Sequence, residues 1–546
     1  MQVHQTQAIG VCYTPEAIAQ SIAIDTLDLL FASQTPQQIQ QIAILDPACG
    51  EGVFLRCAYR YLHWWYTRHS PQPLSWQQCQ AIVQTHLFGV DIDRVAIAKT
   101  QQFLQQEVWQ SCQSSLPFNL DRNVKWGNAI LEFDWHLEFP QVFDNGGFDA
   151  VIGNPPYADA KWMSHHVPQW REYCTQHYQA ASGNWDLFCI FIELALRLCK
   201  PQGLTSFIVP NKLASARYAA STRRLLSQEN CLLQVRDYSS IPVFPGAVYP
   251  VVYLAQKRSP TLQDAVRYEK MQLNSDRQIQ TGDTHDLAYR RFTRSPKQPW
   301  QLSIPDATVV AIDRLQNQFP PLSAIADVLG AATVAEAYHI QALIREGNSD
   351  RLDLKLVNSG TIDRYQFLWG EKTLRYLGDN YRYPIIPQDA LSELPPRRLE
   401  QAKCSKLVVA GMTKVLEAAI DLNGDVLAGK STCIIFSSLD LRYLLALLNS
   451  QFMTFYYRTV FGGDRLQGGY LRVGVAQLRS LPIVIAQESQ RDRLIHQVNR
   501  LLELYPQLSA TQATPIRRQI QALNRQIDEQ VYQLYNITAD SLRAPR

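Results

Sequence analysis

Apolar and polar positions alternate in blocks along the first half of the chain. Short apolar runs predict strands, and segments with apolar residues three and four positions apart predict helices. Strands are expected at residues 42–45, 87–90, 148–153, 203–209 and 251–256, and helices at residues 16–31, 53–65, 95–109 and 187–199. Thr14 is expected to cap the first helix, with Pro15 at its first position. Strands that alternate with helices indicate an α/β fold with a mostly parallel sheet and helices on both faces.

The pattern changes after about residue 259, where short mixed segments with many turns replace the alternation. We therefore expect a first domain over residues 1–260 and a second over residues 261–485. Residues 486–546 are strongly helical, with one apolar stripe along their second half. The stripe consists of Ile516, Ile520, Leu523, Ile527 and Leu534. It predicts a helical hairpin packed on the body of the second domain, rather than a zipper for a partner.

Composition and charge exclude only a few classes of protein. The formal net charge is +3, from 52 Lys and Arg against 49 Asp and Glu, so a nucleic-acid surface would have to be a local basic patch. The 11 cysteines include no C-x-x-C pair. This predicts reduced thiols in a cytoplasmic protein, with no disulfide framework and no bound metal. Neither a secretory signal nor an apolar run of bilayer length is visible, so no membrane association is expected.

A first candidate site follows the first expected strand. Asp46 ends that strand, and Gly50 and Gly52 lie in the turn before the next helix. Glycines let a backbone turn tightly and approach a ligand, and ligands of doubly wound sheets bind outside the carboxyl ends of the strands. Taken alone, such a turn is more often structural than a cofactor loop.

A second acidic residue, Asp91, ends the next expected strand. A carboxylate at this place can accept hydrogen bonds from both hydroxyls of a ribose. In dinucleotide-binding folds it follows the glycines by about 20 residues; here it comes later, which predicts an inserted helix within residues 59–85. The alternative is that the acidic side chain caps the following helix, a role that fits Asp93 better than Asp91.

The sequence Asn154-Pro155-Pro156-Tyr157 directly follows the strand expected at residues 148–153. The prolines make this turn rigid and lack N–H groups. The Asn154 side-chain oxygen and the Pro155 carbonyl can therefore accept both hydrogens of an exocyclic amino group and aim its nitrogen at a methyl donor. Such a transfer depends on positioning and electrostatics, without a general base. The Tyr157 ring can stack on a purine.

The order of these motifs resembles that of the gamma-class amino-methyltransferases of DNA, in particular the TaqI-like and type IIG restriction–modification group. The resemblance implies a Rossmann-like domain that binds S-adenosylmethionine and yields S-adenosylhomocysteine, followed by a mixed α/β target-recognition domain that ends in a helical hairpin. It implies cofactor contacts from Tyr13, Thr14, Asp46, Ala48, Gly50, Asp91, Asn128 and Asn154. Thr14 and the Asp46 turn would contact the methionine end, Asp91 would hold the ribose, and Asn128 would accept from the adenine amino group.

The resemblance continues beyond the catalytic turn. It implies catalytic roles for Asn154, Pro155, Tyr157 and Phe244. Phe244 would stack on a flipped adenine opposite Tyr157; the alternative is a core aromatic residue beside a turn. Residues 447–450 and 478–483 resemble parts of the TaqI-like specificity domain, and residues 527–535 resemble the tails of type IIG proteins.

Basic residues of the second half are candidates for DNA contact, although each one alone is more often a solvated surface charge. The main candidates are Lys414, Arg458, Arg465 and Arg472, and further candidates are Lys403, Lys406 and Lys430. Phosphate contacts from such residues would position a duplex while other side chains read the bases.

These features together predict a site-specific methyltransferase that acts on the N6 amino group of a flipped-out adenine in duplex DNA. We expect it to act as a monomer, on DNA in the nucleoid, beside a separate cognate restriction endonuclease. Only about a dozen residues precede Tyr13, so no nuclease is expected in this chain. Two alternative substrates stay open, because protein glutamine and RNA adenine present the same kind of amino group.

Overall fold

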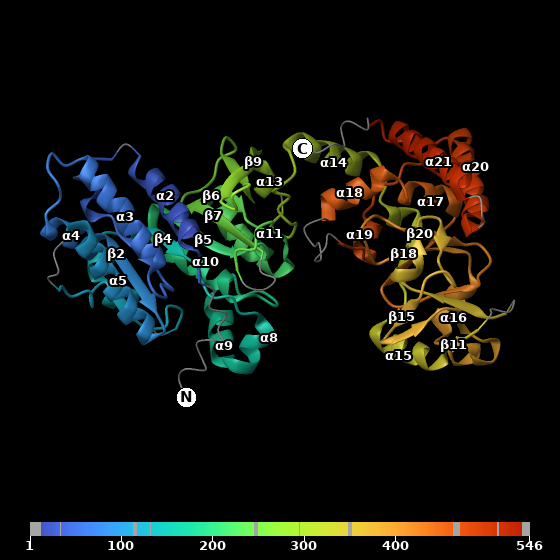
Figure 1. Cartoon of the computed structure of the whole chain (residues 1–546), viewed down its shortest axis with the longest axis horizontal. Helices are drawn as coiled ribbons and strands as arrows, with labels where there is room; N and C mark the ends of the chain where they lie inside the picture. The colour runs from blue at the N-terminus through green and yellow to red at the C-terminus, as the bar shows by residue number, and fades with distance from the viewer. Residues whose placement is uncertain are drawn as a thin grey trace. The chain divides into compact units, whose positions relative to one another are not determined.

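The computed structural model of the chain describes residues 13–32, 34–35, 37–112, 117–131, 133–244, 249–293, 295–347, 352–461, 470–509 and 513–537. It contains two compact units, Met1–Pro305 and Asp306–Arg546 (Figure 1).

The first unit is built on a nine-stranded sheet, counted over the described residues, with the order β3-β2-β1-β4-β5-β7-β6-β8-β9. The strands are β1 Ile44–Asp46, β2 Leu87–Asp91, β3 Val124–Trp126, β4 Phe148–Gly153, β5 Cys199–Pro210, β6 Cys231–Asp237, β7 Pro250–Gln256, β8 Ala265–Leu273 and β9 Ile279–Ala288. Strands β1 to β5 pair in parallel, and β7 is antiparallel to both of its neighbours. The expected α/β fold with a mostly parallel sheet is confirmed.

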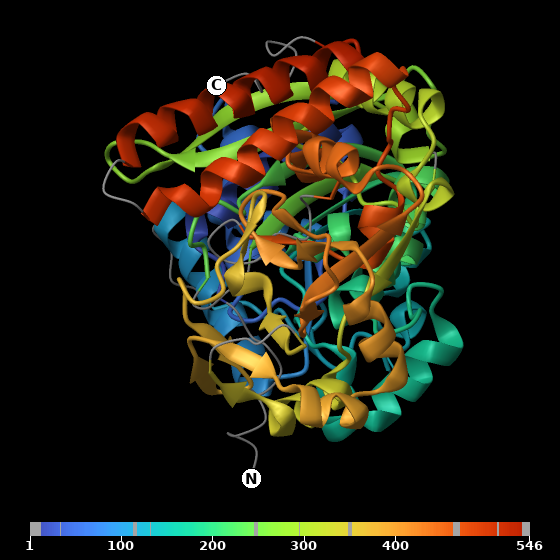
Figure 2. The same ribbon diagram turned by 90° about the vertical axis from the view of Figure 1, so that its right-hand side faces the viewer.

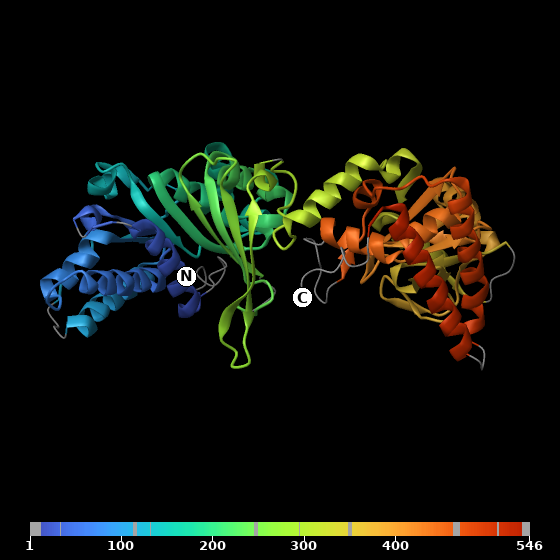
Figure 3. The same ribbon diagram turned by 90° about the horizontal axis from the view of Figure 1, so that it is seen from above.

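The first unit extends past the boundary expected at residue 260. Strand β8 pairs in parallel with β6, and β9 pairs with β8. The hairpin of β8 and β9 projects from the edge of the sheet in Figure 3. These strands complete the sheet of the first unit, and their buried residues Val266, Tyr268 and Leu287 belong to its core. The sequence analysis misassigned them because their mixed polarity resembles the second half of the chain.

Helices cover both faces of this sheet, because side chains alternate between its faces along each strand. On β4, Ala150 and Ile152 belong to one core cluster, whereas Phe148 and Val151 belong to the other. The helices on the first cluster are α2 Glu16–Phe31, α3 Val53–Arg68, α4 Trp76–His86 and α5 Arg94–Cys112. The helices on the second include α8 Ala160–His166, α9 Pro168–His177 and α10 Leu187–Leu198.

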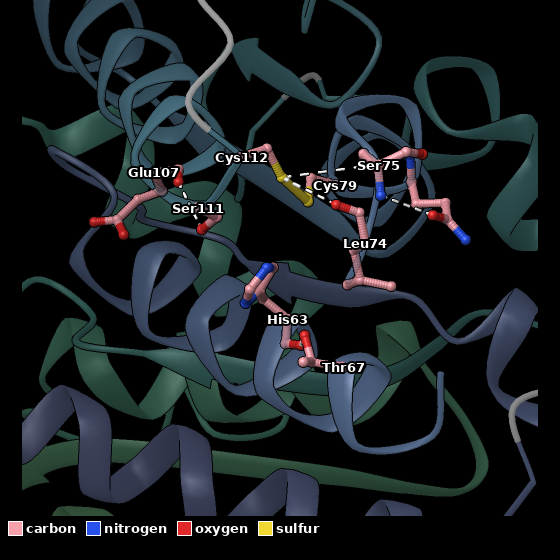
Figure 4. Close-up of a disulfide and its surroundings, with 9 residues drawn as sticks. His63, Thr67, Leu74, Ser75, Cys79, Glu107, Ser111 and Cys112 are labelled. Carbon is pink, nitrogen blue, oxygen red and sulfur yellow. Dashed lines mark hydrogen bonds between the residues drawn. A yellow bond between two sulfur atoms is a disulfide. The ribbon is translucent and has the colours of Figure 1, made fainter. Parts of the chain in front are cut away.

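Two local expectations in this unit are wrong. Pro15, not Thr14, occupies the N-cap position of α2, and no side chain caps this end; the Thr14 hydroxyl accepts a hydrogen bond from Asn154 instead. A disulfide also joins Cys79 of α4 to Cys112 of α5, with 7.2 Å between the Cα atoms (Figure 4). The inserted helix α4 packs against α5 and brings together two cysteines separated by 33 positions, a proximity that no local motif reveals.

The second unit combines small sheets with helices. One described sheet consists of β10 Ala326–Gly330, β22 Thr432–Ser437, β18 Lys406–Ala410 and β20 Ala418–Asp421. Another consists of β11 Arg345–Glu346, β17 Pro384–Ile386, β12 Leu354–Val357 and β21 Val426–Ala428. The helices include α14 Asp306–Gln318, α15 Val334–Leu343, α16 Pro396–Lys403, α17 Leu441–Leu448, α18 Gln451–Phe461, α19 Val475–Arg479, α20 Glu488–Leu504 and α21 Ala513–Leu534.

The last two helices, α20 and α21, lie side by side and appear in red in Figure 2. Ile520 and Ile527 of the expected stripe are buried in one cluster with Tyr443 and Leu444 of α17. The helical hairpin is therefore part of the core of the second unit. Over the described residues, no helix combines the length and the apolar character needed to cross a bilayer.

Candidate active site

The turn between β1 and α3 has the geometry that its glycines were expected to provide. Gly50 has φ +52° and Gly52 has φ +80°, a region that side chains disfavour. A Cβ on Gly52 would also lie 2.7 Å from Cγ2 of Thr100 on α5. The Gly50 N–H donates to Oδ2 of Asp91 over 2.8 Å. The end of β2 thereby holds the glycine turn in place.

Asp91 is itself fixed by the backbone that follows it. Its Oδ1 accepts from the Asp93 N–H over 2.8 Å, and burial raises the pKa of its carboxyl group. Asp93 Oδ1 accepts from the Val95 N–H over 2.8 Å at the start of α5. The helix cap is thus Asp93, and Asp91 faces the glycine turn. Each carboxylate oxygen of Asp91 can accept a second hydrogen bond.

Asp46 lies behind the glycine turn and is not exposed to solvent. Its side chain is fully buried, and Oδ1 accepts from the Ala48 N–H over 3.1 Å. Oδ2 is buried without a hydrogen-bond partner among the described residues. Burial raises the pKa of this carboxyl group well above its usual value. A Cβ on Gly153 would lie 2.6 Å from Oδ1, so glycine at the end of β4 makes room for Asp46.

A pocket opens at the carboxyl ends of β1, β2 and β4. It brings together most of the predicted site, namely Tyr13, Thr14, Ala48, Gly50, Asp91, Asn128, Asn154 and Pro155. Asp46, Tyr157 and Phe244 are not among its lining residues. Several other lining residues were not predicted, among them Trp170 of α9 and Leu187 and Phe191 of α10, because large apolar residues on helices look like ordinary core positions. Ile92 was not predicted either, although its place directly after Asp91 was a usable signal.

Asn128 lines this pocket, and its side-chain oxygen accepts from the backbone. Asn128 Oδ1 accepts from the N–H groups of Ile130 over 3.1 Å and Leu131 over 3.3 Å. A carboxamide oxygen has two lone pairs, and both are engaged here. The group that Asn128 most readily offers to a ligand is therefore its Nδ2 donor, and the expected acceptor role stays a prediction.

The turn Asn154–Tyr157 after β4 is anchored from several elements. Asn154 Nδ2 donates to Oγ1 of Thr14 over 3.0 Å. The Tyr157 hydroxyl lies 2.6 Å from Oδ1 of Asn154 and 3.0 Å from the carbonyl oxygen of Ile208 on β5. Beyond the turn, the Ala158 N–H donates to Asp186, which caps α10. The Asn154 carboxamide is thereby held from both of its ends.

The rings of Tyr157 and Phe244 meet next to this turn. Their centroids are 6.3 Å apart and their planes make an angle of 76°, an edge-to-face contact. Phe244 is only 4% exposed and belongs to the core cluster on the α2–α5 side of the sheet. Because the two rings touch each other, a base could stack between them only after one of them moves.

Three of the basic residues predicted to contact DNA lie close together on the second unit. Lys414 follows β19 Met412–Thr413, which pairs with β23 Leu471–Arg472, and Arg458 of α18 donates to the Lys414 carbonyl over 2.5 Å. The side chains of Lys414, Arg458 and Arg472 are exposed. Arg465 lies outside the described residues. Lys406 is not a surface residue, because its fully buried ammonium group pairs with Asp421.

One group of side chains has the composition of a metal site. Over the described residues, it consists of His63, Cys79 and Cys112, whose potential ligand atoms lie within 4.8 Å of one another (Figure 4). The two sulfur atoms are bonded to each other, so neither is a thiolate. Only the imidazole is left as a ligand, so the cluster is a disulfide with a neighbouring histidine rather than a metal site.

Comparison with known families agrees with the two units. Residues 85–244 match the family of Eco57I restriction-modification methylases. Residues 358–483 match the TaqI-like C-terminal specificity domain. The first match covers strands and helices around the pocket, and the second lies entirely within the second unit.

Individual relatives are distant in sequence. The chain is 22% identical over 262 residues to the type II restriction enzyme and methyltransferase RM.Eco57I of Escherichia coli, covering 43% of this chain and 26% of the relative. It is 22% identical over 394 residues to the type II methyltransferase M.BstVI of Geobacillus stearothermophilus, covering 68% of this chain and 66% of the relative. The chain thus spans less than two thirds of the length of either relative.

Solved structures share the fold. The type IIL restriction-modification enzyme MmeI, in complex with DNA, aligns with a TM-score of 0.59 at 15% identity, over 98% of this chain and 76% of that one. A nuclease-deletion mutant of the type ISP restriction-modification enzyme LlaGI, in complex with a DNA substrate mimic, aligns with a TM-score of 0.54 at 11% identity, over 91% and 47%. The chain joins an Eco57I-like restriction-modification methylase region to a TaqI-like C-terminal specificity domain, as the resemblance of its motifs implies.

Proposed function

We propose that the protein is a type II DNA methyltransferase of a restriction–modification system, which methylates the N6 amino group of a specific adenine in duplex DNA. The observation that carries this proposal is the shared pocket. Asn154 and Pro155, the acceptors for an amino group, line the same pocket as the glycine turn and Asp91. A methyl donor and an amino group bound at these two places would be neighbours.

The pocket residues fit S-adenosylmethionine. Asp91 retains acceptor capacity toward ribose hydroxyls, and Asn128 offers a donor toward a ring nitrogen of the cofactor adenine. Thr14 lies where the methionine end is expected. When bound, this cofactor supplies an electrophilic methyl group on sulfonium.

The chain's own residues position the target amino group. Asn154 Oδ1 and the Pro155 carbonyl oxygen accept its two hydrogens, which directs the nitrogen lone pair toward the pocket. The amino group loses its proton only after attack, so electrostatics and orientation account for the rate. An adenine can reach this site only out of the base stack. Tyr157 supplies a stacking face, and Phe244 supplies a second one if the edge-to-face contact opens.

The second unit is proposed to recognise the sequence. Lys414, Arg458 and Arg472 would contact phosphates, which positions the duplex without reading its bases. One relative is named a type II restriction enzyme and methyltransferase, so a cognate endonuclease activity is the proposed biological partner. We propose that one chain acts on DNA as a monomer.

The test is incubation of the protein with labelled S-adenosylmethionine and a mixture of duplex DNA, RNA and protein. Label in N6-methyladenine of DNA, within one short sequence, is the expected result. Label in RNA adenine or in protein glutamine would contradict DNA as the substrate and identify the other molecule instead. Label in cytosine would leave a DNA methyltransferase but contradict the adenine assignment.

A further inference from the structure

His63, Cys79 and Cys112 form a disulfide with a neighbouring histidine only while the two sulfur atoms are bonded to each other. Reduction of that bond turns the same three side chains into two thiols beside an imidazole. Thiolate sulfur and imidazole nitrogen are the ligands that Zn²⁺ prefers, whereas Mg²⁺ and Ca²⁺ prefer oxygen. The reduced cluster therefore has the composition of a zinc site.

The three side chains come from three helices that pack against one another. His63 lies on α3, Cys79 on α4 and Cys112 at the end of α5. Their potential ligand atoms all lie within 4.8 Å of one another (Figure 4). In a tetrahedral site with zinc–sulfur bonds of about 2.3 Å, two sulfur ligands are about 3.8 Å apart. The three atoms are thus close enough to share one ion once the sulfur atoms separate.

The backbone at the two cysteines leaves room for this wider spacing. The Cα atoms of Cys79 and Cys112 are 7.2 Å apart, whereas disulfides usually span about 4.4–6.8 Å between Cα atoms. Separated sulfur atoms therefore fit the positions of α4 and α5. Cys79 is fully buried, but His63 and Cys112 are half-buried, so an ion can reach the cluster from solvent.

We propose that the reduced cluster binds one Zn²⁺ ion, so that a disulfide and a zinc site are alternative states of the same three helices. A dithiol reductant supplies two electrons and two protons, which convert the S–S bond into two thiols, and it becomes a disulfide itself. Binding of the ion releases both thiol protons to solvent. It forms two zinc–sulfur bonds and one zinc–nitrogen bond with the unprotonated His63 ring, and water fills the fourth position.

Both states hold α4 against α5, but only the zinc state also ties α3 to them. Helices α3 and α5 flank the glycine turn, since α3 begins directly after Gly52 and Thr100 of α5 donates to the Gly50 carbonyl over 2.7 Å. The zinc state should therefore stabilise the first unit when its thiols are reduced. Zn²⁺ at about 100 times its dissociation constant should raise the midpoint of thermal unfolding of the reduced protein by about 5 °C.

The experiment measures zinc binding to the untagged full chain in its oxidised and reduced forms. The reduced form is prepared with dithiothreitol, which is then removed by gel filtration without oxygen. Elemental analysis after equilibrium dialysis against Zn²⁺ should find one more ion per reduced chain than per oxidised chain. Co²⁺ in place of Zn²⁺ should give the absorption of a tetrahedral cobalt–thiolate complex. No bound ion in the reduced protein, or equal binding by the two forms, would overturn the proposal.

Three variants test which side chains bind the ion. His63→Ala keeps both cysteines and their disulfide, yet it should lower the zinc affinity of the reduced protein more than about 100-fold, because even the partners behind metal ligands contribute about 10–100-fold. Cys112→Ser should have the same effect. Cys404→Ser is the matched control, since Cys404 is an exposed free cysteine outside the cluster, and it should bind zinc like the wild type.

Circular dichroism compares the folding of the variants. If His63→Ala does not fold, the comparison of Cys112→Ser with Cys404→Ser decides. Unchanged zinc affinity in a folded His63→Ala variant would overturn the proposal. A loss of zinc in Cys404→Ser as large as that in Cys112→Ser would overturn it as well, because the ion would then bind elsewhere.

Discussion

A single carboxylate, Asp91, connects the glycine turn to the pocket. It accepts from Gly50 and Asp93 and lines the cavity at the same time. Removal of this side chain therefore affects ligand contacts and the conformation of the turn together. A cap residue such as Asp93 affects only its helix. The two neighbouring acidic residues thus make a matched pair for mutation.

Asp91→Ala should weaken S-adenosylmethionine binding by about 1.5–3 kcal/mol for each charge-assisted hydrogen bond that the ribose loses. Asp93→Ala should cost about 1 kcal/mol of stability through loss of the cap, with cofactor affinity nearly unchanged. Calorimetry and urea titrations separate the two effects. Equal cofactor affinities in the two variants would contradict the proposed contact between Asp91 and the ribose.

Asn154→Ala should abolish methyl transfer with cofactor binding nearly intact, because it deletes an acceptor for the target amino group. Tyr157→Phe is the control, since it keeps the stacking ring and removes only the hydroxyl beside Asn154 Oδ1. We expect the control to stay active, with a rate only about two- to tenfold lower, the effect of losing one hydrogen bond. Single-turnover rates on the methylated sequence measure both. Transfer at the normal rate by Asn154→Ala would contradict the mechanism.

Residues on strand ends could be recognised from the sequence, and their partners could not. Asp91 and Asn154 follow apolar runs, and a strand end in a doubly wound sheet is where ligands bind. The bond from Asn154 to Thr14 spans 140 positions and leaves no periodic signal. Asn128 was predicted as an acceptor because the sequence does not show that its oxygen already accepts from the backbone.

At the scale of elements, the junction between the Asn154–Tyr157 turn and α10 carries a titrating group. Asp186 accepts from the Ala158 and Phe188 N–H groups, and burial raises its pKa from 3.8 to about 6. Folding therefore favours the protonated acid. The stability that this group contributes is fully present below pH 3.8, and it is lost as the pH rises through about 6.

Asp186→Asn removes this titration and keeps an acceptor for Ala158. The wild type should lose about 2–3 kcal/mol of unfolding free energy relative to the variant between about pH 4 and pH 8, at about 1.36 kcal/mol per pKa unit. Urea titrations of both proteins at the two pH values give the difference, in which other titrating groups cancel. A stability difference that does not change with pH would mean that the pKa of Asp186 is not raised in the folded protein.

Strands β18 and β20 of the second unit are joined by a buried ion pair. Lys406 pairs with Asp421, and both side chains are almost fully buried, whereas Lys355 and Asp425 form a pair over 2.9 Å that is about one third exposed. Lys406→Met should destabilise the protein by about 3–5 kcal/mol, because it leaves a buried charge without its partner. Lys355→Met should cost about 0–1 kcal/mol. Equal costs in thermal or urea unfolding would contradict this reasoning.

At the scale of the whole molecule, the fold class was predictable and the end of the first unit was not. The alternation of strands and helices up to β7 identifies the doubly wound sheet. Strands β8 and β9 carry polar and charged residues on their exposed face, as an edge hairpin covered on one side must. The sequence therefore looked like the start of another domain at a place where the same sheet continues to β9.

The position of this boundary predicts how the chain can be divided. A fragment that ends at Pro305 keeps the whole sheet, so it should fold and bind S-adenosylmethionine. A fragment that ends at Ser259 lacks β8 and β9, and it exposes the edge of β6 and the core around Val235. We expect this shorter fragment to aggregate or to unfold. Circular dichroism and calorimetry on the two fragments test the boundary.

The fragment that ends at Pro305 should bind cofactor yet lose sequence-selective binding to duplex DNA. The proposed target of its catalytic turn is one adenine, and one base cannot define a site. Reading several base pairs needs side chains at groove edges, each good bidentate contact contributing about 1–3 kcal/mol of discrimination. Loss of the phosphate contacts proposed for Lys414, Arg458 and Arg472 should also flatten the dependence of binding on salt. Methylation of a random duplex pool, followed by sequencing, should give one short motif for the full chain and none for the fragment. The same motif from both would place sequence recognition in the first unit.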